Sequence, residues 1–190
     1  MASPVFHGLA GAGLAYAMAG DASLPLFASL RKALPRLAAG AALACLPDVD
    51  YLPGLWRGYL NTTHQQATHG AAWVLLVSAG LWWVGRAWKP EGFGWRAALF
   101  ILVLVGSHLA IDLLTEDRLA PYGIPLGAPF SERTVQTPFA LLPAWDKTAL
   151  ADLGSWNNLR ALGTELGAGL AFAAGCGIAK RRKPALGCGT

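Results

Sequence analysis

The sequence predicts an all-helical membrane protein, a bundle of about five membrane-spanning helices that forms one domain over residues 1–190. Two observations predict this fold class: 54% of the residues are hydrophobic and only 14% are charged, and the apolar residues gather in long runs. An ordinary soluble domain carries roughly a quarter charged residues, so the composition disfavours one. It also argues against disorder, because the apolar surface is large enough to offset the entropy of ordering the chain.

Five apolar runs account for the expected helices. A membrane-spanning helix needs about 17 to 25 residues, and the runs approach or reach that length at residues 5–20, 34–47, 69–88, 97–116 and 159–179. The last run has small residues at four-residue spacing, which permits close approach of a neighbouring helix. We therefore expect a packing seam at Gly163, Gly167, Ala171 and Gly175.

Basic residues predict the orientation of these helices. Cytoplasmic loops carry an excess of Lys and Arg, and ten of the fifteen basic residues fall on one side of the five-span arrangement: Arg31, Lys32, Arg36, Arg86, Lys89, Arg96, Lys180, Arg181, Arg182 and Lys183. The C-terminus is therefore expected in the cytoplasm and the N-terminus outside. These short clusters between apolar runs favour membrane topology over nucleic-acid binding. No Lys or Arg precedes the first run, which argues against a signal peptide.

A Pro-rich segment, from about residue 117 to 158, falls on the outer side of this arrangement. Its first half shows little helical periodicity. Unpaired backbone is too costly to lie in lipid. We expect this segment to form a lid or re-entrant cap over the outer end of the bundle.

Seven His and Asp side chains lie in the outer halves of the expected spans or in the outer loops: His7, Asp48, Asp50, His64, His69, His108 and Asp112. An ionisable residue inside a span costs roughly 2.5 to 3.5 kcal/mol and is a functional candidate by default. His108 and Asp112 lie in the run ALFILVLVGSHLAIDLL, four residues apart, and so share one helix face. This spacing suits a shared metal ion, or a ligand and the partner that orients it.

Two further motifs contribute the remaining candidates. Asp48 and Asp50 lie in LPDVDYL, where flanking prolines bracket a helix end, so both carboxylates can point to one side. Carboxylates this close bind one cation or bridge two. His64 and His69 are about 140° apart on an ideal helix, so we expect Thr68 to cap the helix, His69 to lie in its first turn and His64 to extend from the preceding loop.

Each motif alone has a structural alternative. A single His near a helix end is most often hydrogen-bonded at the membrane interface, and PDVD is as often a capped turn as a metal site. Glu165 is expected to reach back to the interface and is not assigned to the site. The metal-site interpretation therefore depends on the combination of motifs on one membrane face.

The ordered motifs resemble the YdjM-like family of bacterial inner-membrane proteins, which are regarded as metal-dependent hydrolases. The resemblance covers about residues 5 to 130 and rests on the N-terminal His, LPDVDYL, HQQATH, and SHLAIDLLT followed by PYGIPLGAPF. It implies a bacterial inner-membrane location and metal-site roles for the seven residues named above. The chain departs from the family pattern at Gln65, where Arg is usual, at Gly70, where Ser is usual, and in three additional residues, Glu116, Asp117 and Arg118. These departures bear on substrate contacts more than on metal binding.

The ligand order is also similar to that of the zinc-dependent phospholipase C and P1 nuclease group, all-helical enzymes whose zinc cluster hydrolyses phosphoesters. That similarity rests on ligand order alone. It implies that five residues are ligands shared with that group: His7, Asp48, His69, His108 and Asp112. Asp50 and His64 would then be additional ligands or would contact the ligands.

The sequence therefore predicts a metal-dependent hydrolase with one to three divalent cations, zinc first and manganese second. Such cations acidify water and neutralise charge on phosphoryl oxygens. The expected substrate is an amphiphilic or lipid-linked phosphoester cleaved at the periplasmic face, with Asp50 and His64 as catalytic residues. The alternatives are a non-catalytic membrane protein that binds or transports metal, and a membrane adaptor with a vestigial site. The oligomeric state is left open.

Overall fold

The computed structural model describes residues 1–58, 64, 66–118 and 122–182. Over these residues the regular secondary structure is helical, as predicted, with two isolated β-bridges. The long helices are α1 (Pro4–Ala19), α2 (Leu26–Ala44), α4 (Ala71–Trp88), α5 (Trp95–Leu113) and α6 (Trp156–Arg182). The short elements are the 3₁₀ turns η1 (Leu46–Asp50), η2 (Ala67–His69) and η3 (Leu150–Gly154), and the helix α3 (Tyr51–Trp56).

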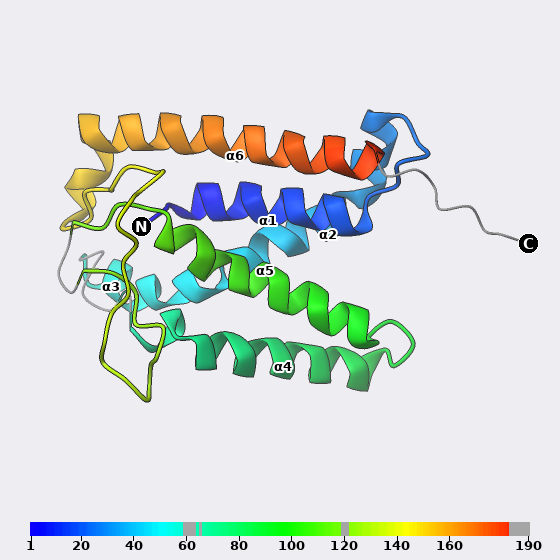
Figure 1. Cartoon of the computed structure of the whole chain (residues 1–190), viewed down its shortest axis with the longest axis horizontal. Coiled ribbons are helices and arrows are strands. Elements are labelled where there is room, and N and C mark those ends of the chain that lie inside the picture. The colour runs from blue at the N-terminus through cyan, green and yellow to red at the C-terminus, as the bar shows by residue number, and fades with distance from the viewer. Residues whose placement is uncertain (59–63, 65, 119–121, 183–190) are drawn as a thin grey trace, which may run out of the picture.

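The long helices run side by side, with α1 in contact with α2, α5 and α6, and with α4 packed on α5 (Figure 1). The N-terminus, α3 and the Pro-rich segment lie at one end of the bundle, which we call the site end. The connections from α1 to α2 and from α4 to α5 lie at the opposite end. An apolar cluster between α4 and α5 includes Val74, Ile101, Val105 and Leu109, and it also contains Met1 and Ile124 from the site end.

Helices α1 and α2 cross closely because each presents a glycine to the other. A Cβ added at Gly11 would lie 2.4 Å from the carbonyl oxygen of Gly40, and one added at Gly40 would lie 2.7 Å from the carbonyl oxygen of Gly11. Small residues permit such contacts between membrane helices. His7 lies one helical turn before Gly11 and stacks on His108 of α5, with 3.7 Å between ring centroids.

The packing seam predicted on α6 was wrong. The four residues of the predicted seam are all exposed: Gly163, Gly167, Ala171 and Gly175. A Cβ added at any of the three glycines among them would meet nothing within 4 Å. The buried face contains Ala161, Glu165 and Gly169, and a Cβ at Gly169 would lie 2.8 Å from Leu9 of α1. Small residues recur at four-residue spacing on both faces of this helix, so spacing alone did not identify the packed one.

The second helix begins earlier than predicted, at Leu26 rather than near residue 34, and it contains Pro35. The predicted loop residues Arg31, Lys32 and Arg36 are therefore on α2, with their side chains exposed. The Lys32 ammonium lies 3.0 Å from the Asp21 carboxylate in the preceding connection. Basic residues are as common on an exposed helix face as in a loop. The cluster of Arg31, Lys32 and Arg36 therefore did not distinguish the two.

Five membrane spans are not confirmed. Two helices, α5 with 19 residues and α6 with 27 residues, are long and apolar enough to cross a membrane. The 16 residues of α1 extend only about 24 Å at 1.5 Å per residue, less than the ~30 Å hydrocarbon core. Three basic residues in α2, and the Trp residues and Arg86 in α4, lower the apolar character of those helices.

The Pro-rich segment covers the site end of the bundle, in agreement with the expected cap. We call residues 122–154 of this segment the cap segment. The Ala71 N–H at the start of α4 donates to the Leu126 carbonyl at 2.9 Å, and the Leu141 N–H donates to the Leu114 carbonyl at 2.7 Å. These bonds, together with buried Ile124, hold the cap segment to the ends of α4 and α5.

Candidate metal centre

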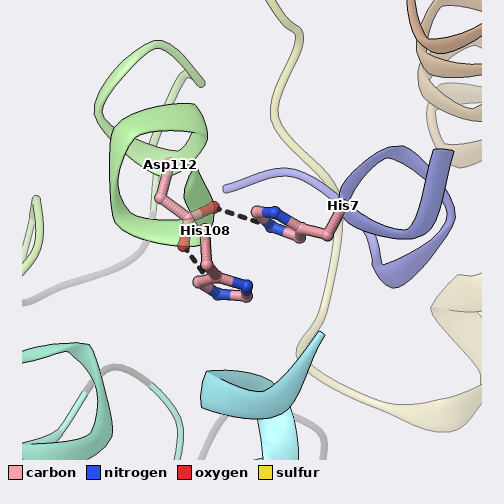
Figure 2. Close-up of side chains that lie close together, drawn as sticks. All are labelled: His7, His108 and Asp112. Atoms are coloured by element: carbon pink, nitrogen blue, oxygen red, sulfur yellow. Dashed lines mark ion pairs between the residues drawn. The ribbon is translucent and has the colours of Figure 1, made fainter. Parts of the chain in front are cut away.

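Asp112 lies between two histidines from different helices (Figure 2). Its Oδ1 is 3.3 Å from Nε2 of His7 on α1, and its Oδ2 is 3.2 Å from Nε2 of His108 on its own helix. The Ala2 N–H donates to the same Oδ1 at 3.2 Å. All three side chains are buried. The four-residue spacing therefore places His108 and Asp112 together, as predicted, and α1 brings His7 to them.

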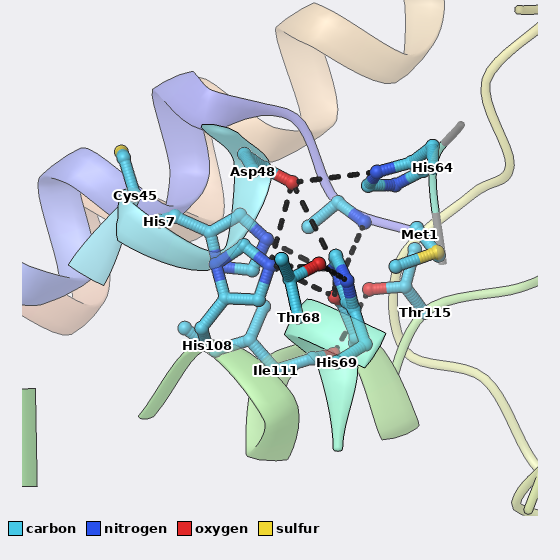
Figure 3. Close-up of polar contacts among 12 residues, drawn as sticks. Met1, His7, Cys45, Asp48, His64, Thr68, His69, His108, Ile111 and Thr115 are labelled. Atoms are coloured by element: carbon cyan, nitrogen blue, oxygen red, sulfur yellow. Dashed lines mark hydrogen bonds and ion pairs between the residues drawn. The ribbon is translucent and has the colours of Figure 1, made fainter. Parts of the chain in front are cut away.

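His69 and Asp48 approach the same point from η2 and η1 (Figure 3). The Nε2 of His69 is 3.2 Å from Nε2 of His108 and 3.6 Å from Oδ2 of Asp112. The Oδ1 of Asp48 is 3.4 Å from Nε2 of His108 and 3.9 Å from Nε2 of His69. We call these four atoms, from Asp48, His69, His108 and Asp112, the central donor set.

Five of the six distances within the central donor set lie between 3.2 and 3.9 Å, close to the spacing of ligands around a tetrahedral metal ion. Ligand bonds of about 2.0 to 2.1 Å in tetrahedral geometry place ligand atoms about 3.3 Å apart. Two imidazole nitrogens face each other at 3.2 Å. This contact is stabilising only if a proton or a metal cation lies between the two nitrogens. Two imidazoles and two carboxylates are a ligand mixture that zinc accepts.

Hydrogen bonds orient both central histidines with Nε2 toward the centre. His108 Nδ1 donates to the Ala44 carbonyl at 2.7 Å, so in the neutral ring Nε2 carries the lone pair. His69 Nδ1 lies 3.3 Å from Oδ2 of Asp50, which also accepts a hydrogen bond from Thr68 Oγ1 at 2.6 Å. Metal-bound histidines have such partners on the second ring nitrogen, which fix the tautomer and the ring orientation.

Asp50 and His64 form a second pair beside the central donor set. His64 Nδ1 is 2.8 Å from Oδ1 of Asp50 and 3.9 Å from Oδ1 of Asp48, and its ring stacks on Tyr51. The turn η1 directs both carboxylates to one side, as the flanking prolines predicted. Burial lowers the pKa of His64 to about 4, against the raising effect of Asp50. Burial works to raise the pKa of Asp50, but hydrogen bonds from His64 and His69 hold it below its usual value.

Several buried polar atoms have no hydrogen-bond partner among the residues that the structure describes. At the site end they include Nδ1 of His7, Nε2 of His64 and Oδ2 of Asp48. Leaving a buried polar atom unpaired costs about 1 to 3 kcal/mol. Three overlapping groups have ligand atoms within 4.8 Å of one another: His7, His108 and Asp112; Asp48, His69 and His108; Asp50, His64 and His69. The seven predicted side chains therefore gather at one place, and these groups could hold a metal ion.

The predicted cap at Thr68 was wrong. Helix α4 begins at Ala71, with Gly70 as its N-cap, and His69 lies in the 3₁₀ turn before it. The Thr68 hydroxyl donates to Asp50 instead of to the backbone of α4. His64 extends from a non-helical segment, as predicted.

Sequence reasoning missed two buried charged residues at the site end. Glu165 accepts hydrogen bonds from Ser3 and, at 2.7 Å, from Trp145 Nε1. Lys147 Nζ donates to the Tyr51 hydroxyl at 2.6 Å, and burial lowers its pKa. The argument that identified His108, an ionisable residue in an apolar helix, applied equally to Glu165. Lys147 lies in an irregular segment and carried no comparable pattern.

Comparison with known proteins supports the family resemblance. The family model described as YdjM inner membrane protein matches residues 1–183, which include all seven predicted site residues. No curated protein and no solved structure matches the chain. The similarity to the phospholipase C and P1 nuclease group therefore stays a prediction from ligand order. The chain belongs to the YdjM inner membrane protein family.

Proposed function

We propose that the protein is a metal-dependent hydrolase of the inner membrane that cleaves a phosphoester of an amphiphilic or lipid-linked substrate. The central donor set is the observation that carries this proposal. Its atoms come from η1, η2 and α5, segments far apart in the sequence, and the measured separations lie between 3.2 and 3.9 Å. Buried carboxylates and imidazoles in such proximity are costly without a cation to share.

We propose one to three ions, zinc in preference to manganese, and the grouping of the ligands is consistent with this proposal. Asp112 faces His7 with one carboxylate oxygen and His108 with the other, so it would hold a metal ion together with either histidine. The Oδ1 of Asp48 lies 3.4 Å from Nε2 of His108 and 3.9 Å from Nδ1 of His64, so Asp48 connects the central donor set to His64. When bound, zinc would supply the Lewis acidity that lowers the pKa of water and neutralises charge on a phosphoryl oxygen.

His64 and Asp50 are suited to proton transfer in this reaction. The Nδ1–H of His64 donates to Asp50, which leaves Nε2 as the atom able to accept a proton. With a pKa of about 4, His64 is neutral at pH 7. Its Nε2 is buried and has no hydrogen-bond partner among the described residues. We assign His64 the role of proton acceptor and Asp50 that of the group which fixes its tautomer.

We further propose that the site end faces the periplasm and that the C-terminus is cytoplasmic. The connection between α4 and α5 and the end of α6 lie opposite the site end (Figure 1). Basic residues there, including Lys89, Arg96 and Lys180, follow the distribution of cytoplasmic loops. A substrate from the outer leaflet could then reach the site laterally.

The experiment that tests this proposal measures phosphoester hydrolysis by the purified protein. With zinc or manganese, the protein should hydrolyse chromogenic phosphomonoesters or phosphodiesters, and a chelator should abolish the activity until metal is restored. His108→Ala should remove it, whereas Glu132→Gln, at an exposed residue of the cap segment, should retain it. Hydrolysis that persists in folded His108→Ala would refute the proposal. A metal-loaded protein without hydrolase activity would favour the non-catalytic metal-binding alternative.

A further inference from the structure

Lys147 is a buried amine that forms no ion pair with an acidic side chain among the residues that the structure describes. Its side chain belongs to the cap segment and is 9% exposed, and its Nζ donates to the Tyr51 hydroxyl at 2.6 Å. The ion pairs among the described residues do not include Lys147. Burying a charged amine without a paired charge is costly. Nearby carboxylates such as Asp48 and Asp112 attract Lys147 without forming an ion pair with it, so an anion that bound beside Lys147 would supply a direct partner.

Lys147 also lines a pocket of about 410 Å³ that adjoins the central donor set. The accessible lining of the pocket is almost entirely apolar, and its three side chains with polar ends near the metal centre are Asp48, Tyr51 and Lys147. Its mouth is apolar, with Leu52 and Leu153 at 63% and 48% exposure, whereas Asp48 is only 9% exposed. Ligand pockets have volumes of roughly 300 to 1,000 Å³ and combine apolar walls with a few polar groups.

We propose that Lys147 binds the anionic group of the substrate and that this pocket holds the substrate's hydrocarbon chain. The inference rests on the proposed function, because Asp48 joins the pocket to the metal centre. An anion at the base would lie between the Lys147 ammonium and the central donor set, while the chain would extend past Leu52 and Leu153. The substrate class is therefore an amphiphile with a phosphate group attached directly to a hydrocarbon chain.

The test measures binding of three probes to the zinc-loaded full chain in amphipol: octyl phosphate, inorganic phosphate and octanol. Octyl phosphate should bind at least tenfold more tightly than inorganic phosphate. Lys147→Met should weaken octyl phosphate binding by at least tenfold, since a hydrogen bond to a charged group contributes roughly 1.5 to 3 kcal/mol, and should leave octanol binding within twofold. Lys147→Arg should retain most of the affinity. The matched control, Lys89→Met at the opposite end of the bundle, should have no effect.

Zinc affinity, measured on each variant, separates this inference from the proposed function. If Lys147→Met binds both zinc and octyl phosphate as the unaltered protein does, the inference is overturned and the proposed function stands. If the unaltered protein binds no zinc, the proposed function fails. The inference is then decided by one result, namely whether Lys147→Met weakens the binding of octyl phosphate. Equal affinity for octyl phosphate and inorganic phosphate would overturn the role of the pocket. Should Lys147→Met not fold, Leu153→Trp decides: blocking the mouth should weaken octyl phosphate binding but not phosphate binding.

Discussion

Replacing Asp112 with asparagine should weaken zinc binding by roughly 100-fold. Asp112 contacts histidines with both oxygens, at 3.3 Å to His7 and 3.2 Å to His108. Structural zinc sites bind with about 10 to 16 kcal/mol, so one donor of four contributes about 3 kcal/mol, which corresponds to roughly two decades of affinity. Asparagine keeps the size of the side chain and can still accept from Ala2, but it loses the negative charge.

Competition with a chromophoric zinc chelator, in detergent solution, measures this change. Glu116→Gln is the matched control, because Glu116 lies near the same end of the bundle and pairs with exposed Arg118 at 2.8 Å. Its zinc affinity should stay within twofold of the unaltered protein. If folded Asp112→Asn binds zinc within threefold of the unaltered protein, the assignment of Asp112 to the centre is wrong.

Three further predictions follow from the contacts around the site. Thr68→Val should lower zinc affinity about tenfold, because Asp50 loses a hydrogen bond that helps to orient a ligand, and Thr68→Ser should restore it in the same titration. Gly11→Ala should destabilise the protein by about 1 to 3 kcal/mol through a clash at the α1 and α2 crossing. Gly167→Ala, with open space around it, should be neutral or slightly stabilising. Thermal unfolding in detergent measures both variants, and equal effects on stability would contradict the packing of α1 on α2. In the metal-free protein, the pKa of His64 is about 4 against an ordinary value of about 6.5, so its contribution to stability is complete above about pH 6.5 and is lost as the pH falls toward 4. His64→Gln should therefore show a shallower loss of stability over that range, and an unchanged slope would count against the assignment.

The sequence was most informative where function depends on local spacing. His108 and Asp112 are four residues apart on one helix, and this distance alone brings their side chains to 3.2 Å. The prolines of LPDVDYL similarly predicted a helix end at which Asp48 and Asp50 share a side, because proline restricts the backbone wherever it occurs.

The sequence was least informative where the outcome depends on distant segments. Glu165 is buried because Ser3 and Trp145 donate hydrogen bonds to it, and neither is near it in sequence. The packed face of α6 depends on which small residues meet α1, and Gly169 and Gly167 are equivalent in local pattern. Lys147 lies in a segment without periodicity, so only the tertiary structure places it beside Tyr51.

Elemental analysis of the purified protein tests the metal centre most directly. The account predicts at least one zinc or manganese ion per chain in the unaltered protein, and a stoichiometric loss in folded His108→Ala, because His108 Nε2 lies within 3.4 Å of donor atoms from Asp48, His69 and Asp112. A folded protein that retains no transition metal after purification in metal-supplemented buffer, or one whose metal content is unchanged in His108→Ala, would contradict it.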